Sequence, residues 1–451
     1  MNTPSKPVRI LAAAAAAIAM TACVSGPAPV QATAAAPMTA TVDIPDTPAG
    51  RQATWLLDAA PRAPIPDNEL AGHFTADFLK AVPPAQLNQT LVSVKAMTLE
   101  KILAAQDTHL VARITVGTTP FDMVIDVDAT GLMNGLRFAE PLKPAPTPTS
   151  WAEVDKRVRA VAPESGFLAA ELTDSGKCRP VHGVAADEAR PLGSMFKLYV
   201  LGAVVSSVRS GAFGWDTQLT ITPGRRSLGS GGLQERPDGS KVSVLEAAKL
   251  MISISDNTAT DLLVHKVGRK AVERTMRSWG LRDKRNEPLL TTRALFVLKG
   301  VDYPAHVKKY VSLSTSKQRA YLEKVVDKVP LSKIQPYSSP RELDTIEWFA
   351  SPSDTCRAYA GLVKLGDRRI GEIMSINDAG LGLDKARWPA VWYKGGSEPG
   401  VSDLGFLGRT SKGKTYVVTT LATNPKALLG DQTAVEQLAL TRGGFTLAKD
   451  S

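Results

Sequence analysis

The period of apolar and polar positions changes several times along the chain. Two stretches, 68–81 and 84–94, have the pattern of helices, whereas 109–116 and 121–128 alternate apolar and polar residues as half-buried strands do. A Gly-Thr-Thr-Pro turn separates the two alternating stretches. The pattern therefore predicts a small α+β domain over residues 65–139.

A second group of elements follows in the larger, C-terminal part of the chain. A helix capped by Ser150 and a strand at 167–173 open it, and a long, mostly helical middle comes next. Three strand-like stretches and a final helix close it: 391–394, 404–409, 415–422 and 433–440. This order predicts an α+β domain over residues 150–451, with an antiparallel sheet flanked by helices.

Two segments lack the pattern of a folded core. Residues 24–64 are rich in Ala, Pro and Thr, and we expect a flexible tether there, with a short element around 55–57. Residues 140–149 contain four prolines, which favour an extended, stiff linker. The sequence therefore predicts two folded domains behind a tether.

The first 23 residues have the pattern of an export signal. Lys6 and Arg9 precede an apolar stretch at 10–19, which is too short to span a bilayer. The following residues, Met-Thr-Ala-Cys, resemble the bacterial lipobox, in which the cysteine is lipidated. We expect residues 1–23 to be a lipoprotein signal peptide and Cys23 to anchor the protein to the outer face of the cytoplasmic membrane; plain secretion is the alternative.

Composition narrows the class of protein further. The chain has 451 residues, of which 43% are apolar and 22% charged, and this is ordinary for globular domains. The net charge is +10, but the basic residues are spread out, without a dense run or interleaved aromatic residues. We therefore expect a solvated basic surface and no nucleic-acid partner.

The remaining cysteines and the histidines do not have the spacing of metal ligands. Cys178 and Cys356 have no metal-ligand spacing, and in an exported protein we expect them to form a disulfide, with two buried thiols as the alternative. The five histidines also lack metal spacing, and no glycine-rich loop has a nucleotide-binding form. The sequence therefore predicts no metal and no cofactor.

The candidate chemistry begins with Ser194 and Lys197, which form a Ser-x-x-Lys pattern. This pattern occurs three times in the chain, but only at Ser194 does an apolar helix continue from it. Residues three apart on a helix are neighbours. A buried lysine with a lowered pKa could then remove the serine proton and make the hydroxyl a nucleophile.

Two further motifs follow in order along the chain. Ser255-Asp256-Asn257 lies in an apolar helical context, and residues 394–397 read Lys-Gly-Gly-Ser at the end of a predicted strand. Together with Ser194-x-x-Lys197, these motifs resemble those of class A β-lactamases and penicillin-interacting peptidases over roughly residues 150–448. The layout also resembles the β-lactamase-like hydrolase of clavulanic acid pathways and related actinobacterial lipoproteins.

The resemblance implies a β-lactamase/transpeptidase-like fold and acyl-enzyme chemistry. Ser194 would be the nucleophile, Lys197 its base and Ser255 the proton relay to the leaving group. Backbone N–H groups of Ser194 and Ser397 would stabilise the oxyanion. The residues expected to bind substrate are Asn257, Lys394, Gly396 and Ser397.

Two departures from the family pattern concern substrate binding and turnover. Gly395 stands where the family has a hydroxyl that helps to bind the substrate carboxylate. Residues 285–291 resemble the family's deacylation loop except at Thr291, so Glu287 is a candidate deacylation base. The alternative for Glu287 is a loop carboxylate paired with Arg285 or Arg293. An insertion at 296–350 has no equivalent of this length in the family.

These patterns leave three functions open. The first is hydrolysis of β-lactams, and the second is a D,D-peptidase or esterase with little β-lactam turnover. The third is a non-catalytic cell-envelope lipoprotein that retains the fold. The expected partners are a small β-lactam or cell-wall peptide and the membrane. For the domain at 65–139, whose outline resembles the nuclear-transport-factor and ketosteroid-isomerase class, binding, spacing or dimerisation is favoured over chemistry.

Overall fold

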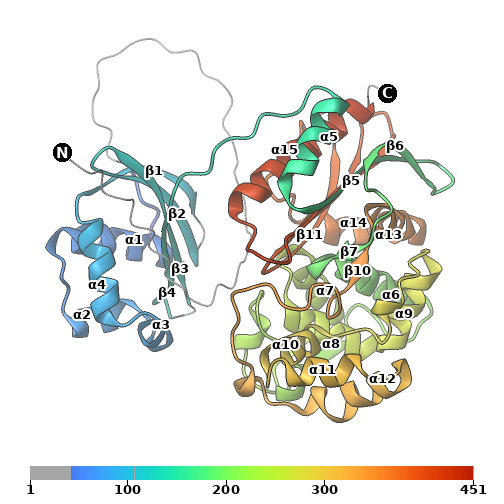
Figure 1. The fold of residues 1–451 in the computed structure, drawn as a ribbon, viewed down its shortest axis with the longest axis horizontal. Coiled ribbons are helices and arrows are strands. Elements are labelled where there is room, and N and C mark those ends of the chain that lie inside the picture. The colour runs from blue at the N-terminus through green and yellow to red at the C-terminus, as the bar shows by residue number, and fades with distance from the viewer. Residues whose placement is uncertain (1–41, 106, 129, 450–451) are drawn as a thin grey trace. The chain divides into compact units, whose positions relative to one another are not determined.

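The computed structural model describes residues 42–105, 107–128 and 130–449. Within these residues the chain divides after Leu142 into two compact units, each with its own core (Figure 1). No helix in this part of the chain combines the length and apolar character needed to span a membrane. The predicted signal peptide and Cys23 lie outside the described residues.

The first unit is a four-stranded antiparallel sheet with helices packed on it. The strands follow one another in space in the order β1-β2-β3-β4. Apolar side chains from the helices and the sheet form one core, which includes Leu56, Leu70, Phe78 and Ile114. The elements are α1 (Pro48–Ala59), η1 (Ala60–Arg62), α2 (Asp67–His73), α3 (Ala76–Ala81), α4 (Pro84–Ser93), β1 (Met97–Ala105), β2 (His109–Val116), β3 (Thr119–Val127) and β4 (Met133–Ala139).

Helix α1 corrects the predicted tether, because it falls within residues 24–64. The Thr47 side chain accepts a hydrogen bond from the Gly50 N–H at 3.0 Å and caps the helix. Ala53 and Leu56 are completely buried in the core of the first unit. Alanine loses no side-chain entropy on burial, so a segment poor in large apolar residues still packs against a sheet.

The second unit is built around a five-stranded antiparallel sheet of order β11-β12-β13-β5-β6. Its strands are β5 (Glu164–Leu172), β6 (Cys178–Val184), β11 (Ala390–Glu398), β12 (Val401–Arg409) and β13 (Thr415–Thr423), and its short strands are β7 (Arg190–Pro191), β8 (Gln218–Thr220), β9 (Lys241–Ser243) and β10 (Phe349–Ala350). Strand β11 lies at an edge of the sheet. Other elements can therefore approach β11 along its outer edge. The third motif, residues 394–397, lies on this strand.

Helices cover both faces of this sheet (Figure 1). Helices α5 (Trp151–Val161) and α15 (Asp431–Lys449) pack on one face through a core that includes Phe167, Phe406 and Phe445. The other face carries the larger core and the remaining helices: α6 (Lys197–Arg209), α7 (Val244–Ser253), α8 (Asn257–Val267), α9 (Arg269–Ser278), α10 (Thr292–Gly300), α11 (Ala305–Val311), α12 (Thr315–Lys324), α13 (Pro352–Leu365) and α14 (Arg368–Met374). The predicted antiparallel sheet flanked by helices is confirmed.

Cys178 of β6 and Cys356 of α13 form a disulfide with their Cα atoms 6.2 Å apart.

The insertion at 296–350 forms helices α11 and α12. It is joined to α9 by an ion pair of two hydrogen bonds between Arg269 and Asp327, at 2.9 and 3.0 Å. Its last residues, Phe349 and Ala350, pair with β7 in a separate two-stranded sheet. The insertion is therefore part of the folded unit.

Candidate active site

Ser194 lies on a single 3-10 turn, η2 (Gly193–Phe196), directly before α6. Gly193 has a φ of +47°, a backbone conformation that a side chain disfavours. On the other side of Ser194, the ring of Phe196 stacks on Trp348, with centroids 3.7 Å apart. These features fix the turn, while Ser194 itself stays half-buried.

Lys197 begins α6 and is fully buried. Its Nζ donates to the Ser255 carbonyl at 2.6 Å, to the Ser255 Oγ at 3.0 Å and to the Asn257 Oδ1 at 2.7 Å. The first and second motifs are therefore in direct contact. Among the described residues, the Ser194 hydroxyl itself has no hydrogen-bond partner, so its oxygen is free to meet a substrate.

The second motif turns the chain between α7 and α8. Ser255 has a φ of +59°, which is unusual for a residue with a side chain. Asp256 holds the turn, because its carboxylate accepts from the Ala259 N–H at 2.7 Å and from the Gly232 N–H at 2.9 Å. Ser230 adds a hydrogen bond from its hydroxyl to the Ser255 carbonyl at 2.7 Å. The strained turn aims the Ser255 side chain at the lysines.

Lys394 brings the third motif to the same hydroxyl. Its Nζ donates to the Ser255 Oγ at 3.1 Å and to the Gly395 carbonyl at 2.7 Å. The Ser255 hydroxyl therefore lies between two lysine amines, those of Lys197 and Lys394. A hydroxyl can accept from one amine and donate to another, so this arrangement can carry a proton between them.

Burial lowers the pKa values of both lysines, and the charge of Lys394 lowers that of Lys197 further. The pKa of Lys197 falls well below its usual range because the side chain is desolvated and lies near the charge of Lys394. Desolvation lowers the pKa of Lys394 to about 7. A lowered pKa favours the neutral form of an amine, which general-base catalysis requires.

Two glycines allow the backbones of η2 and β11 to touch. A Cβ on Gly396 would lie 2.0 Å from the Leu192 carbonyl oxygen and 3.0 Å from the Ser194 nitrogen. A Cβ on Gly193 would lie 2.8 Å from the Ser397 nitrogen. The backbone N–H groups of Ser194 and Ser397 therefore come from segments in close contact, as two donors to one oxyanion must.

Glu287 is not brought to this cluster. Its carboxylate forms an ion pair with Arg277 of α9, rather than with Arg285 or Arg293 as in the alternative from the sequence. Among the described residues, no hydrogen bond joins Glu287 to Ser194 or Lys197. A role for Glu287 in deacylation stays a prediction.

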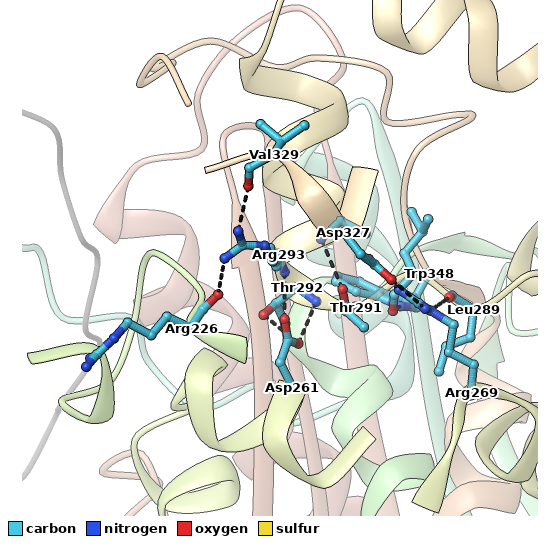
Figure 2. A network of polar contacts seen from close by, with 12 residues as sticks. Arg226, Asp261, Arg269, Leu289, Thr291, Thr292, Arg293, Asp327, Val329 and Trp348 are labelled. Atoms are coloured by element: carbon cyan, nitrogen blue, oxygen red, sulfur yellow. Dashed lines mark hydrogen bonds and ion pairs between the residues drawn. The ribbon is translucent and has the colours of Figure 1, made fainter. Parts of the chain in front are cut away.

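The segment after Glu287 is held by a polar network (Figure 2). Asp261 of α8 accepts hydrogen bonds from the backbone N–H groups of Thr292 and Arg293, at 2.8 and 2.9 Å. The Arg269 side chain, which also binds Asp327, donates to the Leu289 carbonyl at 3.1 Å. Helix α8 thus carries the second motif at its start and anchors this segment one turn later.

The sequence analysis assigned no role to three residues that support the site. Gly193, Ser230 and Asp256 shape the site without belonging to the residues expected to act on substrate. A glycine directly before a nucleophile was a visible signal, but the contact between Ser230 and the second motif joins residues far apart in sequence. The described residues contain no group of His, Cys, Asp or Glu side chains arranged to hold a metal ion.

Comparisons with known proteins find similarity to parts of this chain. Residues 151–334 match the model of the beta-lactamase enzyme family, and residues 44–133 match a family described as ORF 12 gene product N-terminal. A β-lactamase regulatory protein, BlaB, from Streptomyces cacaoi is 32% identical over 102 residues, which are 22% of this chain. The match spans only 33% of the length of that regulatory protein.

Two solved structures are similar to this chain at low sequence identity. A β-lactamase from Sphaerobacter thermophilus is 19% identical, with a TM-score of 0.47, and the match covers 67% of this chain and 97% of that one. A structure of PBP-A is 18% identical, with a TM-score of 0.45, and the match covers 69% of this chain and 100% of that one.

Proposed function

We propose that this protein is a serine acyl-transfer hydrolase. Its Ser194 would be acylated by β-lactams or by related amides and esters, in line with the match of residues 151–334 to the beta-lactamase enzyme family. One observation carries the proposal: the Ser255 hydroxyl lies between the amines of Lys197 and Lys394, beside the turn that bears Ser194. This arrangement supplies a base and a proton relay in one buried cluster.

In the proposed reaction, neutral Lys197 removes the proton of Ser194 while the serine oxygen attacks the carbonyl carbon. The N–H groups of Ser194 and Ser397 stabilise the oxyanion, a contribution of about 3–4 kcal/mol for each donor. The bond to the leaving group then breaks, and Ser255 passes it the proton now held by Lys197. Substrate is oriented by Asn257 and by the charge of Lys394.

A second candidate function is the sensing of β-lactams by acylation without turnover. It is favoured by the ion pair of Glu287 with Arg277, because the described contacts join the candidate deacylation base to an arginine and to neither Ser194 nor Lys197. The word regulatory in the name of the Streptomyces cacaoi relative is in line with this candidate, but it describes that protein. A D,D-peptidase or esterase activity rests on the same acylation chemistry.

We expect deacylation to be much slower than acylation. The ester formed at Ser194 needs a positioned base to activate water, and misplacing such a group by about 1 Å can cost roughly a hundredfold in rate. Stopped-flow measurements with nitrocefin, combined with intact-mass spectra, should show a burst followed by an accumulated acyl-enzyme. Steady turnover without a detectable adduct would show that another group deacylates the protein efficiently.

The pH dependence should separate anionic from neutral substrates. Lys394 is charged below its pKa of about 7 and neutral above it, so its attraction for a carboxylate weakens as pH rises. We expect the ratio of acylation rates for benzylpenicillin and its neutral methyl ester to fall about tenfold between pH 5.5 and 8.5. Taking the ratio cancels the effect of Lys197, which acts on both substrates. A flat ratio would contradict the assigned role of Lys394.

We propose further that the protein is exported and anchored through Cys23, on the basis of the lipobox-like sequence. Anchoring would hold the catalytic unit at the outer face of the cytoplasmic membrane, where cell-wall peptides and β-lactams meet. Mass spectrometry of the mature N-terminus should find a diacylated cysteine, whereas an unmodified residue there would favour plain secretion.

A further inference from the structure

The insertion at 296–350 supplies two buried ionisable groups for which the acylation chemistry has no role. Lys299 lies near the end of α10 and Glu347 just before β10, and their side chains are 0% and 1% exposed. The Lys299 Nζ donates to the Oε1 of Glu398 at 2.6 Å and lies 3.7 Å from the Oε1 of Glu347. Burying such groups costs free energy, so we asked which parts of the fold the cluster joins.

Glu398 connects the cluster to strand β11. It directly follows Ser397, whose N–H group is one of the two proposed oxyanion donors. Successive side chains alternate along a strand, so Glu398 faces the same side of β11 as Gly396, which meets the backbone beside Ser194. The ion pair with Lys299 therefore holds the strand directly after the residue that donates to the oxyanion.

Glu347 connects the cluster to the turn that bears Ser194. Its Oε2 accepts from the Trp348 N–H at 2.9 Å, and the Trp348 carbonyl accepts from the Leu192 N–H at 2.7 Å. The Trp348 ring stacks on Phe196, so this tryptophan contacts the chain on both sides of the nucleophile. The segment that carries the other oxyanion donor is therefore also held by the insertion.

The two carboxyl groups of the cluster share one lysine. One oxygen of each, Glu347 Oε1 and Glu398 Oε2, is buried and has no hydrogen-bond partner among the residues that the structure describes. Burial, and then the negative charge of Glu398, raise the pKa of Glu347 well above its usual range. Glu347 therefore keeps its proton and can donate a hydrogen bond to Glu398, whose charge Lys299 balances.

We propose that Lys299, Glu347 and Glu398 are positioning residues that hold β11 and the turn before α6 at the separation that two N–H donors to one oxyanion require. The inference rests on the proposed acylation of Ser194 and gives the insertion a part in it. The three side chains act through the backbone of Ser194 and Ser397 and not on substrate. Their loss should therefore weaken stabilisation of the transition state and leave binding of the intact substrate nearly unchanged.

The first test removes the charges in two steps and follows acylation by a fluorescent penicillin at a series of concentrations. The series separates the acylation rate constant from the dissociation constant of the first, noncovalent complex. Lys299→Met leaves Glu398 buried without its partner and should lower both the melting temperature and the rate constant. Combining it with Glu398→Leu should restore the melting temperature, because replacing both members of a buried ion pair is often neutral for stability.

The double variant should stay slow although it is stable. We expect its acylation rate constant to lie about a hundredfold below that of the wild type, as for the loss of one oxyanion donor. Its dissociation constant should stay within about threefold, because the lost interaction acts only in the transition state. Glu436→Gln, which breaks the ion pair with Arg157 between α15 and α5 on the other face of the sheet, is the matched control and should behave like the wild type.

A second pair of variants tests the hydrogen bonds of Glu347. Glu347→Gln keeps an acceptor for the Trp348 N–H and a donor for Glu398, so it should retain most of the acylation rate constant. Glu347→Leu has a similar volume but keeps neither group, and its rate constant should fall at least about tenfold. A loss of rate in leucine that glutamine avoids indicates a positioning hydrogen bond rather than lost packing. If the double variant does not fold, this pair decides alone.

Each outcome bears on one of the two proposals. Normal acylation by the folded double variant, or equal rates for Glu347→Gln and Glu347→Leu, would overturn the inference and leave the acylation proposal standing. If the wild-type protein is not acylated, the proposed function fails, and this inference fails with it.

Discussion

Replacement of Lys197 by methionine should lower the rate of acylation at Ser194 by about a thousandfold, the middle of the range for loss of a general base. Methionine fills a similar volume but has no lone pair of sufficient basicity. The Ser255 and Asn257 oxygens that now accept from the lysine would also lose their donor. Stopped-flow measurement with a fluorescent penicillin gives the rate directly.

Lys197→Arg serves as the control for charge. Arginine keeps a positive charge and can donate hydrogen bonds, but it does not lose its proton in proteins. Both variants should therefore be inactive if the neutral amine is the base. Activity in Lys197→Arg would contradict that role and assign the residue to charge alone. Thermal melting of each variant shows whether the fold survives.

Gly396→Ala should lower acylation at least about a hundredfold, through the backbone rather than through a side chain. The added Cβ would lie 2.0 Å from the Leu192 carbonyl oxygen, so β11 and the turn that bears Ser194 would have to move apart. The N–H groups of Ser194 and Ser397 could then no longer point at one oxygen. Loss of one oxyanion donor costs about a hundred- to a thousandfold in comparable enzymes.

Gly430→Ala is the matched control, since a Cβ at that position meets no atom within 4 Å. We expect this variant to be acylated like the wild-type protein. Measured by the same stopped-flow assay, normal acylation by Gly396→Ala would show that the two backbone segments do not form the oxyanion site. A melting temperature close to that of the wild type would show that any loss comes from the site.

Sequence predicts the chemistry of this site best where its parts are local. Ser194 and Lys197 are three residues apart on a turn that leads into a helix, so their proximity follows from helical geometry. The meeting of Lys197, Ser255 and Lys394 depends on tertiary packing, and it was expected only because the motifs resemble those of a known family. The sheet and its flanking helices followed from the order of strand-like and helical stretches.

Other features depend on contacts that no local pattern encodes. The direction of Glu287 is set by Arg277 on a neighbouring helix, which its own loop sequence does not indicate. Helix α1 was missed because its buried residues include small alanines, which have no strong apolar signal.

The most direct test of the central claim is peptide mapping by mass spectrometry after the wild-type protein has been incubated with benzylpenicillin. The Ser194→Ala variant, treated in parallel, serves as the blank. We predict a penicilloyl group on the peptide that contains Ser194 and none in the variant. An adduct that persists in the variant, or no adduct in the folded wild-type protein, would contradict the account.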